Sequence, residues 1–233
     1  MKHTIYYDTE TTGVRLDEDR IVEIAAYDPL NKRTFCTFVN PKIPIPQEAT
    51  RVHRISDEMV KDAPPFSAVG KDFIEFCGDD ALLIAHNNDG FDLHILRNEL
   101  KRNELKMPEW KFIDTLKWAR RYRPDLPRHS LQFLREVYGV EMNNAHRALD
   151  DVVVLHEVFS KMIDDLSYAE VLELLSIKKP PKALTEMPFG KHQGVPLEKV
   201  PKNYIKWLSE SGSLEKENNL ALKESLTKLG LLR

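Results

Sequence analysis

The sequence predicts an α/β domain built on a mixed sheet, followed by a smaller C-terminal module. Three β-prone segments open the chain, and two more then alternate with stretches of helical spacing. Strands that come first and later alternate with helices are typical of α/β domains. The composition changes at residues 178–182, Lys-Lys-Pro-Pro-Lys, which indicates a linker between the two parts.

Five segments are expected to be strands, over residues 4–8, 21–27, 33–39, 81–85 and 111–113. Asp-Pro-Leu-Asn, a turn composition, separates the second from the third, so the first three could form an antiparallel meander. The fourth segment, Ala-Leu-Leu-Ile-Ala, is wholly apolar, which is typical of a central strand buried on both faces.

Helices are expected over residues 47–55, 56–62, 66–77, 91–102, 130–138 and 145–163, with one more that follows the last strand and ends near residue 121. Ser56 is expected to cap the second helix, because two acidic residues follow it in the first turn. The helix over 145–163 has the clearest pattern, since apolar residues from Leu155 to Met162 recur at core spacing.

The composition, 42% hydrophobic and 30% charged, is that of a globular protein. A net charge of −3 argues against a protein that coats nucleic acid through charge alone. No apolar run approaches the length of a membrane span, and the start MKHTIYYD does not resemble a signal peptide, so a cytoplasmic location without membrane partners is expected. Cys36 and Cys77 lack a metal-binding spacing and are expected to be core residues.

Asp8 and Glu10 stand at the end of the first strand. Strand side chains alternate with period two, so both carboxylates point to one side of the sheet, where they repel each other. Asp92 opens a helix just after the apolar strand. Asp151 shares a face with Leu155 on the clearest helix and therefore points inward. A solvated strand end, a dipole-stabilising Asp92 and a hydrogen-bonded Asp151 are the alternative explanations.

Four inward carboxylates need counter-charge, and two divalent cations would supply it. Oxygen-only ligands suit Mg²⁺ or Mn²⁺, and a pair of such ions can hold the attacking and leaving oxygens of a phosphodiester. His146, five residues before Asp151, is expected at or before the helix start, where a neutral imidazole could deprotonate a water. A surface histidine is the alternative.

Three segments together resemble the motifs of the DEDDh (DnaQ-like) family of 3′→5′ exonucleases, with a layout similar to exonuclease X and epsilon-type proofreading subunits. They are DTETTG from Asp8, AHNNDGFD from residue 85 and HRALDD from His146. Their order and distances also fit, over about residues 1–165. The second motif has three residues between His-Asn and Phe-Asp where many bacterial members have two. This leaves Asp89 and Asp92 as competing candidates, and Asp92 is chosen because it follows Phe91 and opens the helix.

The resemblance implies an RNase H-like exonuclease fold, with a five-stranded mixed sheet flanked by helices. It implies metal ligation by Asp8, Glu10, Asp92 and Asp151, which are catalytic together with the general base His146. Thr11, Thr12 and Gly13 would cradle the 3′-terminal nucleotide, since glycine permits close backbone approach. The remaining substrate-binding candidates are His53, Asn87 and Phe91.

Two other features lie outside these motifs. Asp114 in FIDTLKWARR matches a common family aspartate and is expected to cap a helix or to support the site. The stretch that follows interleaves four arginines, at positions 120, 121, 123 and 128, with Trp118 and Tyr122. Such a stretch could track a nucleic-acid backbone, and a solvated helix end is the alternative.

The domains are expected at residues 1–165 (exonuclease), 166–185 (helix and linker) and 186–233 (a module that resembles the C-terminal segment of exonuclease X-like proteins). About 50 residues bury little core alone, so the module could dock on the nuclease domain, form a homodimer or bind DNA. The candidate DNA contacts are Lys191, Lys199, Lys202 and Lys206. No convincing clamp-binding peptide follows residue 160, which favours a stand-alone exonuclease over a polymerase partner.

The implied activity is metal-dependent release of 5′-mononucleotides from the 3′ end of single-stranded DNA, in DNA repair or proofreading. No motif distinguishes the 2′-hydroxyl, so an RNA 3′-end-processing exoribonuclease is an alternative. A non-catalytic module that binds nucleic-acid ends is another, although a retired site need not retain four acids and a histidine.

Overall fold

The computed structural model describes residues 3–141, 148–177, 183–215 and 219–232. It divides the chain into two compact units, Met1–Leu175 and Ser176–Arg233. The helix expected within residues 166–185 is α8 (Tyr168–Ser176), and its Val171 is buried in the core of the first unit, which therefore extends past the expected boundary at residue 165. Among the described residues, no helix combines the length and the apolar character needed to cross a bilayer.

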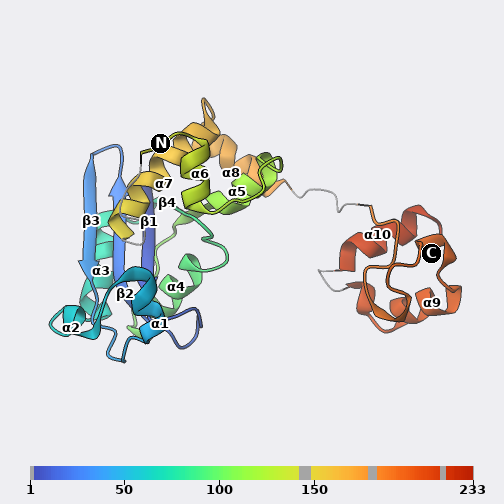
Figure 1. The fold of residues 1–233 in the computed structure, drawn as a ribbon, viewed down its shortest axis with the longest axis horizontal. Coiled ribbons are helices and arrows are strands. Elements are labelled where there is room, and N and C mark those ends of the chain that lie inside the picture. The colour runs from blue at the N-terminus through green and yellow to red at the C-terminus, as the bar shows by residue number, and fades with distance from the viewer. Residues whose placement is uncertain (1–2, 142–147, 178–182, 216–218, 233) are drawn as a thin grey trace. The chain divides into compact units, whose positions relative to one another are not determined.

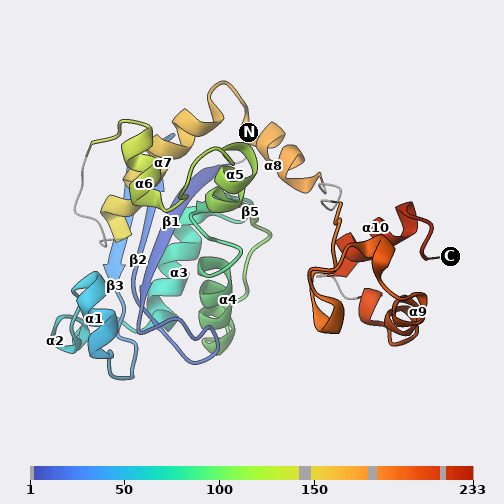
Figure 2. The same cartoon turned by 45° about the vertical axis from the view of Figure 1, so that its right-hand side comes forward.

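A five-stranded mixed sheet forms the centre of the first unit, in the order β3-β2-β1-β4-β5, and its strands can be followed in Figures 1 and 2 together. Its strands are β1 Thr4–Thr11, β2 Ile21–Asp28, β3 Arg33–Phe38, β4 Leu82–Ala85 and β5 Lys111–Asp114. The first three strands pair antiparallel, whereas β4 and β5 run parallel to β1. The predicted meander and the predicted mixed sheet are confirmed.

The helices of the first unit follow the predicted order. They are α1 Gln47–His53, α2 Asp57–Val60, α3 Phe66–Cys77, α4 Asp92–Arg102, α5 Thr115–Tyr122, α6 Leu131–Val137, α7 Ala148–Ile163 and α8. Ser56 is the N-cap residue of α2, although its side chain makes no capping hydrogen bond. Positions 142–147, where the expected helix over 145–163 would begin, lie outside the described residues.

Two layers of helices cover the sheet (Figures 1 and 2). On one face, α3 and α4 pack over Ile5, Tyr7 and Leu83. On the other, α5, α7 and α8 pack over Tyr6 and Ile84. Alternate residues of β1 therefore enter different layers, as the period of a strand requires. By the same alternation, Asp8 and Glu10 belong to the α7 side and Thr9 to the α4 side.

The first strand is longer than predicted. The strand is expected over residues 4–8, yet residues 9–11 also remain paired with β2. Glu10 lies opposite Glu23, and the register then shifts between Glu10 and Thr11. Pairing with a neighbouring strand outweighs local propensity here. Both acidic side chains thus stand on rigid, hydrogen-bonded backbone.

Two expectations about burial need correction. Cys77 is buried as predicted, but Cys36 is exposed, because it lies on the edge strand β3. The C-terminal unit also closes a core of its own, which includes Leu197, Ile205 and Leu222. Its regular elements are η1 Gly190–His192, η2 Leu197–Lys199, α9 Lys202–Glu210, η3 Ser213–Glu215 and α10 Leu220–Lys228.

Candidate active site

Asp8, Glu10 and Asp151 meet between β1 and the first turns of α7. Each offers one carboxylate oxygen, and these oxygens all lie within 4.8 Å of one another. The meeting follows from the fold, because both β1 acids face the layer that contains α7 and Asp151 stands one turn into that helix. The inward orientation predicted for Asp151 brings it to the two strand acids.

Asp92 reaches the site from the opposite layer. It is the first residue of α4, is 4% exposed, and accepts a hydrogen bond of 2.8 Å from the Thr9 hydroxyl. Thr9 lies between Asp8 and Glu10 on β1 but faces α4. It therefore joins the second acidic motif to the first across the strand. Asp92 is not one of the three acids whose oxygens lie within 4.8 Å of one another.

The structure separates the two candidates of the second motif. The side chain of Asp89 is 47% exposed and forms an ion pair of 3.0 Å with Lys117. Asp92 is buried and lies close enough to Asp8 for its charge to perturb that carboxyl. The extra residue in the turn thus places Asp89 at the surface and leaves Asp92 as the inward acid.

Burial and mutual repulsion together control the electrostatics of the site. Burial raises the pKa of Asp8 well above its ordinary value, and the charges of Asp92, Glu10, Asp151 and Glu23 raise it further. Burial also raises the pKa of Asp92 to about 7, although the hydrogen bond from Thr9 opposes this shift. Clustered carboxylates of this kind are stabilised by cations, and an all-oxygen donor set suits hard divalent ions. The residues present therefore fit a divalent metal centre.

The segment Thr11–Gly13 folds into a tight, internally bonded turn. The Thr11 hydroxyl donates to the Gly13 carbonyl at 2.6 Å, and the Thr12 hydroxyl donates to Asp19 at 2.8 Å. A Cβ atom on Gly13 would lie 2.6 Å from an oxygen of Asp19. Gly13 is therefore required by the close approach of the Asp19 carboxylate.

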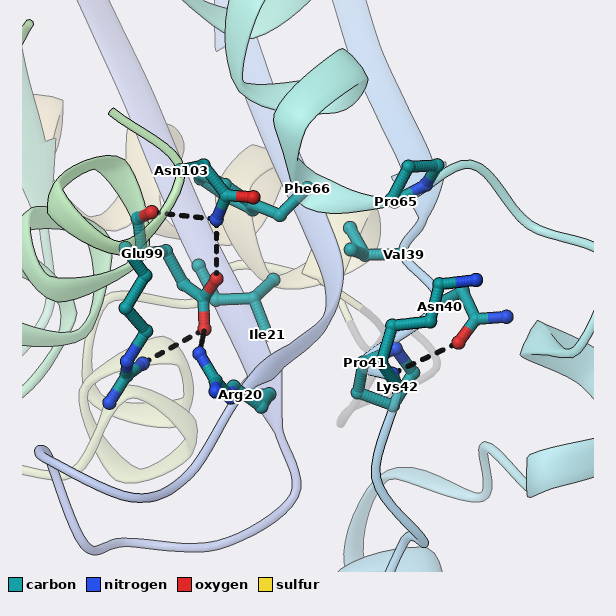
Figure 3. A pocket seen from close by; sticks show the side chains of 11 residues that line it. Arg20, Ile21, Val39, Asn40, Pro41, Lys42, Pro65, Phe66, Glu99 and Asn103 are labelled. Atoms are coloured by element: carbon teal, nitrogen blue, oxygen red, sulfur yellow. Dashed lines mark hydrogen bonds and ion pairs between the residues drawn. The ribbon is translucent and has the colours of Figure 1, made fainter. Parts of the chain in front are cut away.

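The loop that follows this turn is anchored on the end of α4. The Arg102 guanidinium donates to the Asp19 carbonyl at 3.1 Å and to Glu99 at 3.0 Å. Glu99 also pairs with Arg20 at 3.5 Å and accepts from Asn103, as Figure 3 shows in a pocket beside the sheet. These contacts fix the path of the chain between β1 and β2, and hence the position of the turn.

His53 is 2% exposed, and both of its ring nitrogens are engaged. Its Nδ1 accepts from the Ile55 amide at 3.0 Å, so Nε2 carries the proton and donates to the Thr11 carbonyl at 3.2 Å. In this arrangement the ring holds the backbone of the substrate-binding candidate Thr11.

Asp114 holds the backbone of the second motif in place through hydrogen bonds. As predicted, it caps a helix, accepting from the Leu116 and Lys117 amides of α5. It also accepts from the Asn87 amide at 3.1 Å and the Asp89 amide at 3.0 Å. One carboxylate thus fixes both the start of α5 and the turn before α4. Asn87 is exposed with a positive φ of 68°, and Phe91 is partly buried.

His146, the predicted general base, lies outside the described residues. The chain resumes at Ala148, whose amide donates to the Glu23 carboxylate at 3.2 Å. The first turn of α7, which follows His146 by two residues, is thereby attached to β2.

Sequence reasoning did not find two of the supporting residues. Glu23 is 1% exposed, and the signal for it was an acid in the interior of the otherwise apolar strand segment IVEIAAY. Gln132 on α6 donates to Asp151 at 3.1 Å and accepts from Arg135 at 2.9 Å. Nothing in the sequence pattern distinguishes Gln132, because its role depends on how α6 packs on α7.

Of the two aromatic residues in the arginine-rich stretch, Tyr122 is 37% exposed and Trp118 is buried. Trp118 is 3% exposed in the core. Arg123 is held by Asp125 at 2.9 Å, and the Tyr122 hydroxyl donates to the carbonyl of Leu174 at 3.4 Å. The alternation of basic and aromatic residues here reflects packing against α8 and local ion pairs.

Two family models match the chain. The model described as "Exonuclease" covers residues 5–159. A second, described as "Putative quorum-sensing-regulated virulence factor", covers residues 181–219, within the C-terminal unit.

Among curated proteins, those similar to the chain include DNA polymerase III proteins. It is 38% identical over 165 residues to a DNA polymerase III PolC-type from Caldanaerobacter subterraneus subsp. tengcongensis, spanning 70% of this chain but 12% of that one. It is 36% identical over 162 residues to the DNA polymerase III subunit epsilon of Treponema pallidum, spanning 67% of this chain and 74% of that one.

Two solved structures share the fold. Exonuclease I of E. coli with a dA16 oligonucleotide superposes with a TM-score of 0.64 at 19% identity, over 78% of this chain and 46% of that one. Exonuclease X with a 5′-overhanging duplex DNA has a TM-score of 0.57 at 24% identity, over 74% of this chain and 99% of that one. The family model, the epsilon similarity and the shared RNase H-like fold agree with the geometry of the site, and the chain belongs to the DnaQ-like exonuclease family.

Proposed function

We propose that this protein is a metal-dependent 3′→5′ exonuclease that releases 5′-mononucleotides from single-stranded DNA in repair or proofreading. The observation that carries the proposal is the meeting of Asp8, Glu10 and Asp151 within 4.8 Å, with Asp92 joined to the same strand through Thr9. Four neighbouring acids from two layers of the fold lower its stability, and bound cations would offset that cost.

Asp8, Glu10, Asp92 and Asp151 would hold two divalent cations, Mg²⁺ or Mn²⁺, which when bound neutralise the scissile phosphate and lower the pKa of water. Asp114 and Gln132 would keep two parts of this ligand set in place, through the second-motif turn and through Asp151. Glu23 would hold the first turn of α7 against β2.

The chemistry proposed for the chain's own residues is one hydrolytic step. His146 would accept a proton from water as the water oxygen bonds to phosphorus, and the bond from phosphorus to the 3′ oxygen breaks. The leaving 3′ oxygen takes up a proton from solvent, and the released nucleotide retains its 5′ phosphate. Thr11, Thr12, Gly13, Asn87 and Phe91 would position the terminal nucleotide, with His53 supporting Thr11.

Single-stranded DNA is proposed as the substrate because two structural neighbours are exonucleases solved with DNA, one of them with a dA16 oligonucleotide. The epsilon relatives are named as subunits of DNA polymerase III, so a polymerase partner is the alternative to independent action. We propose independent action, because the C-terminal unit matches a different family model.

The test uses purified full-length protein and 5′-labelled single strands of DNA and of RNA. Each strand is incubated with Mg²⁺, with Mn²⁺ and with EDTA, alongside Asp8→Ala. The proposal expects a DNA ladder that shortens from the 3′ end, is lost with EDTA and is lost in the variant. Faster shortening of the RNA strand than of the DNA strand would show that RNA is the preferred substrate. Intact strands under every condition would refute independent catalysis.

A further inference from the structure

An aromatic surface with lysine neighbours lies on the C-terminal unit, outside the region matched by the exonuclease model. Lys191, Asn203, Tyr204 and Trp207 line a depression of about 440 Å³. We call these four residues the aromatic platform. It belongs to η1 and α9 and therefore to a unit that has its own core.

The two rings of the platform are stacked. Tyr204 and Trp207 stand one turn apart on α9, with ring centroids 5.5 Å apart and planes inclined by 25°. The Trp207 side chain is 54% exposed, whereas Trp110 and Trp118 are 7% and 3% exposed. Exposed tryptophans commonly mark a binding surface, because an exposed ring forgoes the large burial energy of an aromatic side chain.

The position of Tyr204 is fixed from several sides. The Lys191 ammonium lies 5.4 Å from the ring centroid, in cation–π range, and the His192 ring meets it edge-on at 4.7 Å. Gly190 has a φ of 77°, and a Cβ there would lie 2.5 Å from the Tyr204 hydroxyl. The backbone before Lys191 thus leaves space for the tyrosine.

Burial of α9 does not depend on Trp207. Ile205 and Leu208 are 2% and 1% exposed and pack into the core of the C-terminal unit. Trp207 lies on the other side of the helix and contributes little to that core. The exposed Trp207 ring is therefore accessible to a ligand.

We propose that the aromatic platform binds single-stranded nucleic acid. A base would stack on Trp207, extending the stack with Tyr204, and Lys191 would approach a phosphate, with Asn203 available to hydrogen-bond a base edge. Lys202 and Lys206 add positive charge on the same helix, where the exposed pair of Lys206 with Glu210, at 3.7 Å, is weak. Stacked aromatic rings with neighbouring lysines suit a ligand that carries both negative charges and flat aromatic bases.

The inference rests on the proposed function for its ligand class, and it extends that function. Two sites on one chain make the second binding event intramolecular, so a strand long enough to reach both is bound more tightly than a short one. The platform should therefore lower the KM for long strands while leaving kcat unchanged. A dinucleotide, which fills the active site only, should not depend on the platform.

The test measures binding of a fluorescein-labelled oligo-dT and the matching oligo-rU to full-length protein in EDTA, where cleavage is stopped. Trp207→Ala is compared with Trp207→Phe, which retains a ring, and with Leu220→Ala, a control at an exposed apolar position of the same unit. We expect Trp207→Ala to raise the Kd by about 5- to 150-fold, the range for one lost stacking contact. The Kd of Trp207→Phe should rise less, and the Kd of the Leu220→Ala control should not change.

The binding measurement also tests the platform independently of the proposed exonuclease activity. Failure of the exonuclease proposal would appear as intact strands with Mg²⁺, whatever the Kd. An unchanged Kd in Trp207→Ala would overturn the platform even if the exonuclease were active. A change in self-association with an unchanged Kd would likewise overturn it and assign the surface to a protein partner. Tighter binding of rU than of dT would retain the platform and change its substrate to RNA.

Discussion

The Thr9 hydroxyl donates a hydrogen bond of 2.8 Å to the buried carboxylate of Asp92. Thr9 stands between Asp8 and Glu10 on β1, but its side chain faces the α4 layer, whereas theirs face α7. This one bond therefore connects acids that belong to opposite faces of the sheet. It also lowers the pKa of Asp92 against the opposing effect of burial, which keeps that carboxyl closer to its ionised form.

Thr9→Val removes the hydroxyl at nearly constant volume and should weaken metal binding. Loss of a residue that orients a metal ligand typically costs about 10- to 100-fold in metal affinity or activity. The measurement is the Mg²⁺ concentration that gives half-maximal cleavage. Thr9→Ser, which keeps the hydroxyl, should behave like the wild type. Equal Mg²⁺ requirements in the Val and Ser variants would show that the bond does not support the site.

Asp8→Asn should stabilise the metal-free protein while abolishing cleavage. Burial and neighbouring charges raise the folded-state pKa of Asp8, so the native state holds its proton more tightly than the unfolded chain does. The stability contributed by protonated Asp8 is therefore complete below the unfolded pKa of about 4 and falls as pH rises toward the folded pKa.

Urea unfolding in EDTA at pH 5 and pH 8 measures this effect. The wild type should be less stable at pH 8 than at pH 5, and Asp8→Asn should reduce that loss of unfolding free energy, since each pKa unit corresponds to about 1.4 kcal/mol. Asn at the exposed Asp80 is the control and should leave the pH dependence as it is. A wild type whose stability rose between pH 5 and pH 8 as much as that of Asp8→Asn would contradict the repulsion described here.

Substitutions at Glu23 can distinguish its role as a hydrogen-bond acceptor for α7 from the effect of its negative charge. Its carboxylate accepts the Ala148 amide at the start of α7, and its charge adds to the repulsion at Asp8. Glu23→Leu should cost about 1–3 kcal/mol of unfolding free energy, because a buried amide loses its acceptor. Glu23→Gln keeps an acceptor oxygen and should retain or increase stability. Equal destabilisation by both substitutions would show that charge, not anchoring, is what α7 requires.

His146→Ala should lower kcat by about 10²- to 10⁴-fold if the imidazole is the general base. Added imidazole should restore part of the activity, since it can enter the space left by the side chain and accept the proton. A structural role would lower activity without such rescue. Unchanged kcat would exclude His146 from the reaction.

The sequence predicted the sheet, most helices and the acid set, because these depend on periodicity and on ordered motifs. Period two placed Asp8 and Glu10 on one face, and core spacing turned Asp151 inward. The roles of Thr9, Glu23 and Gln132 depend on which layer each side chain enters, and on helix packing that no local pattern records. For the same reason, the sequence leaves open whether Trp118 lines a nucleic-acid surface, and the fold places it in the core. The C-terminal core was underestimated, because apolar residues spread over irregular segments show little periodicity.

The central claim is that Asp8, Glu10, Asp92 and Asp151 form one metal-dependent hydrolytic site, and two substitutions in one turn test it most directly. Asp92→Asn and Asp89→Asn change the same chemistry three residues apart, one at the buried acid and one at the exposed acid that pairs with Lys117. The measurement is the rate of 3′-end shortening of single-stranded DNA with saturating Mg²⁺. We expect a loss of about 10³-fold or more for Asp92→Asn and a change within a few-fold for Asp89→Asn. Retained activity in Asp92→Asn, or an equal loss in both variants, would contradict it.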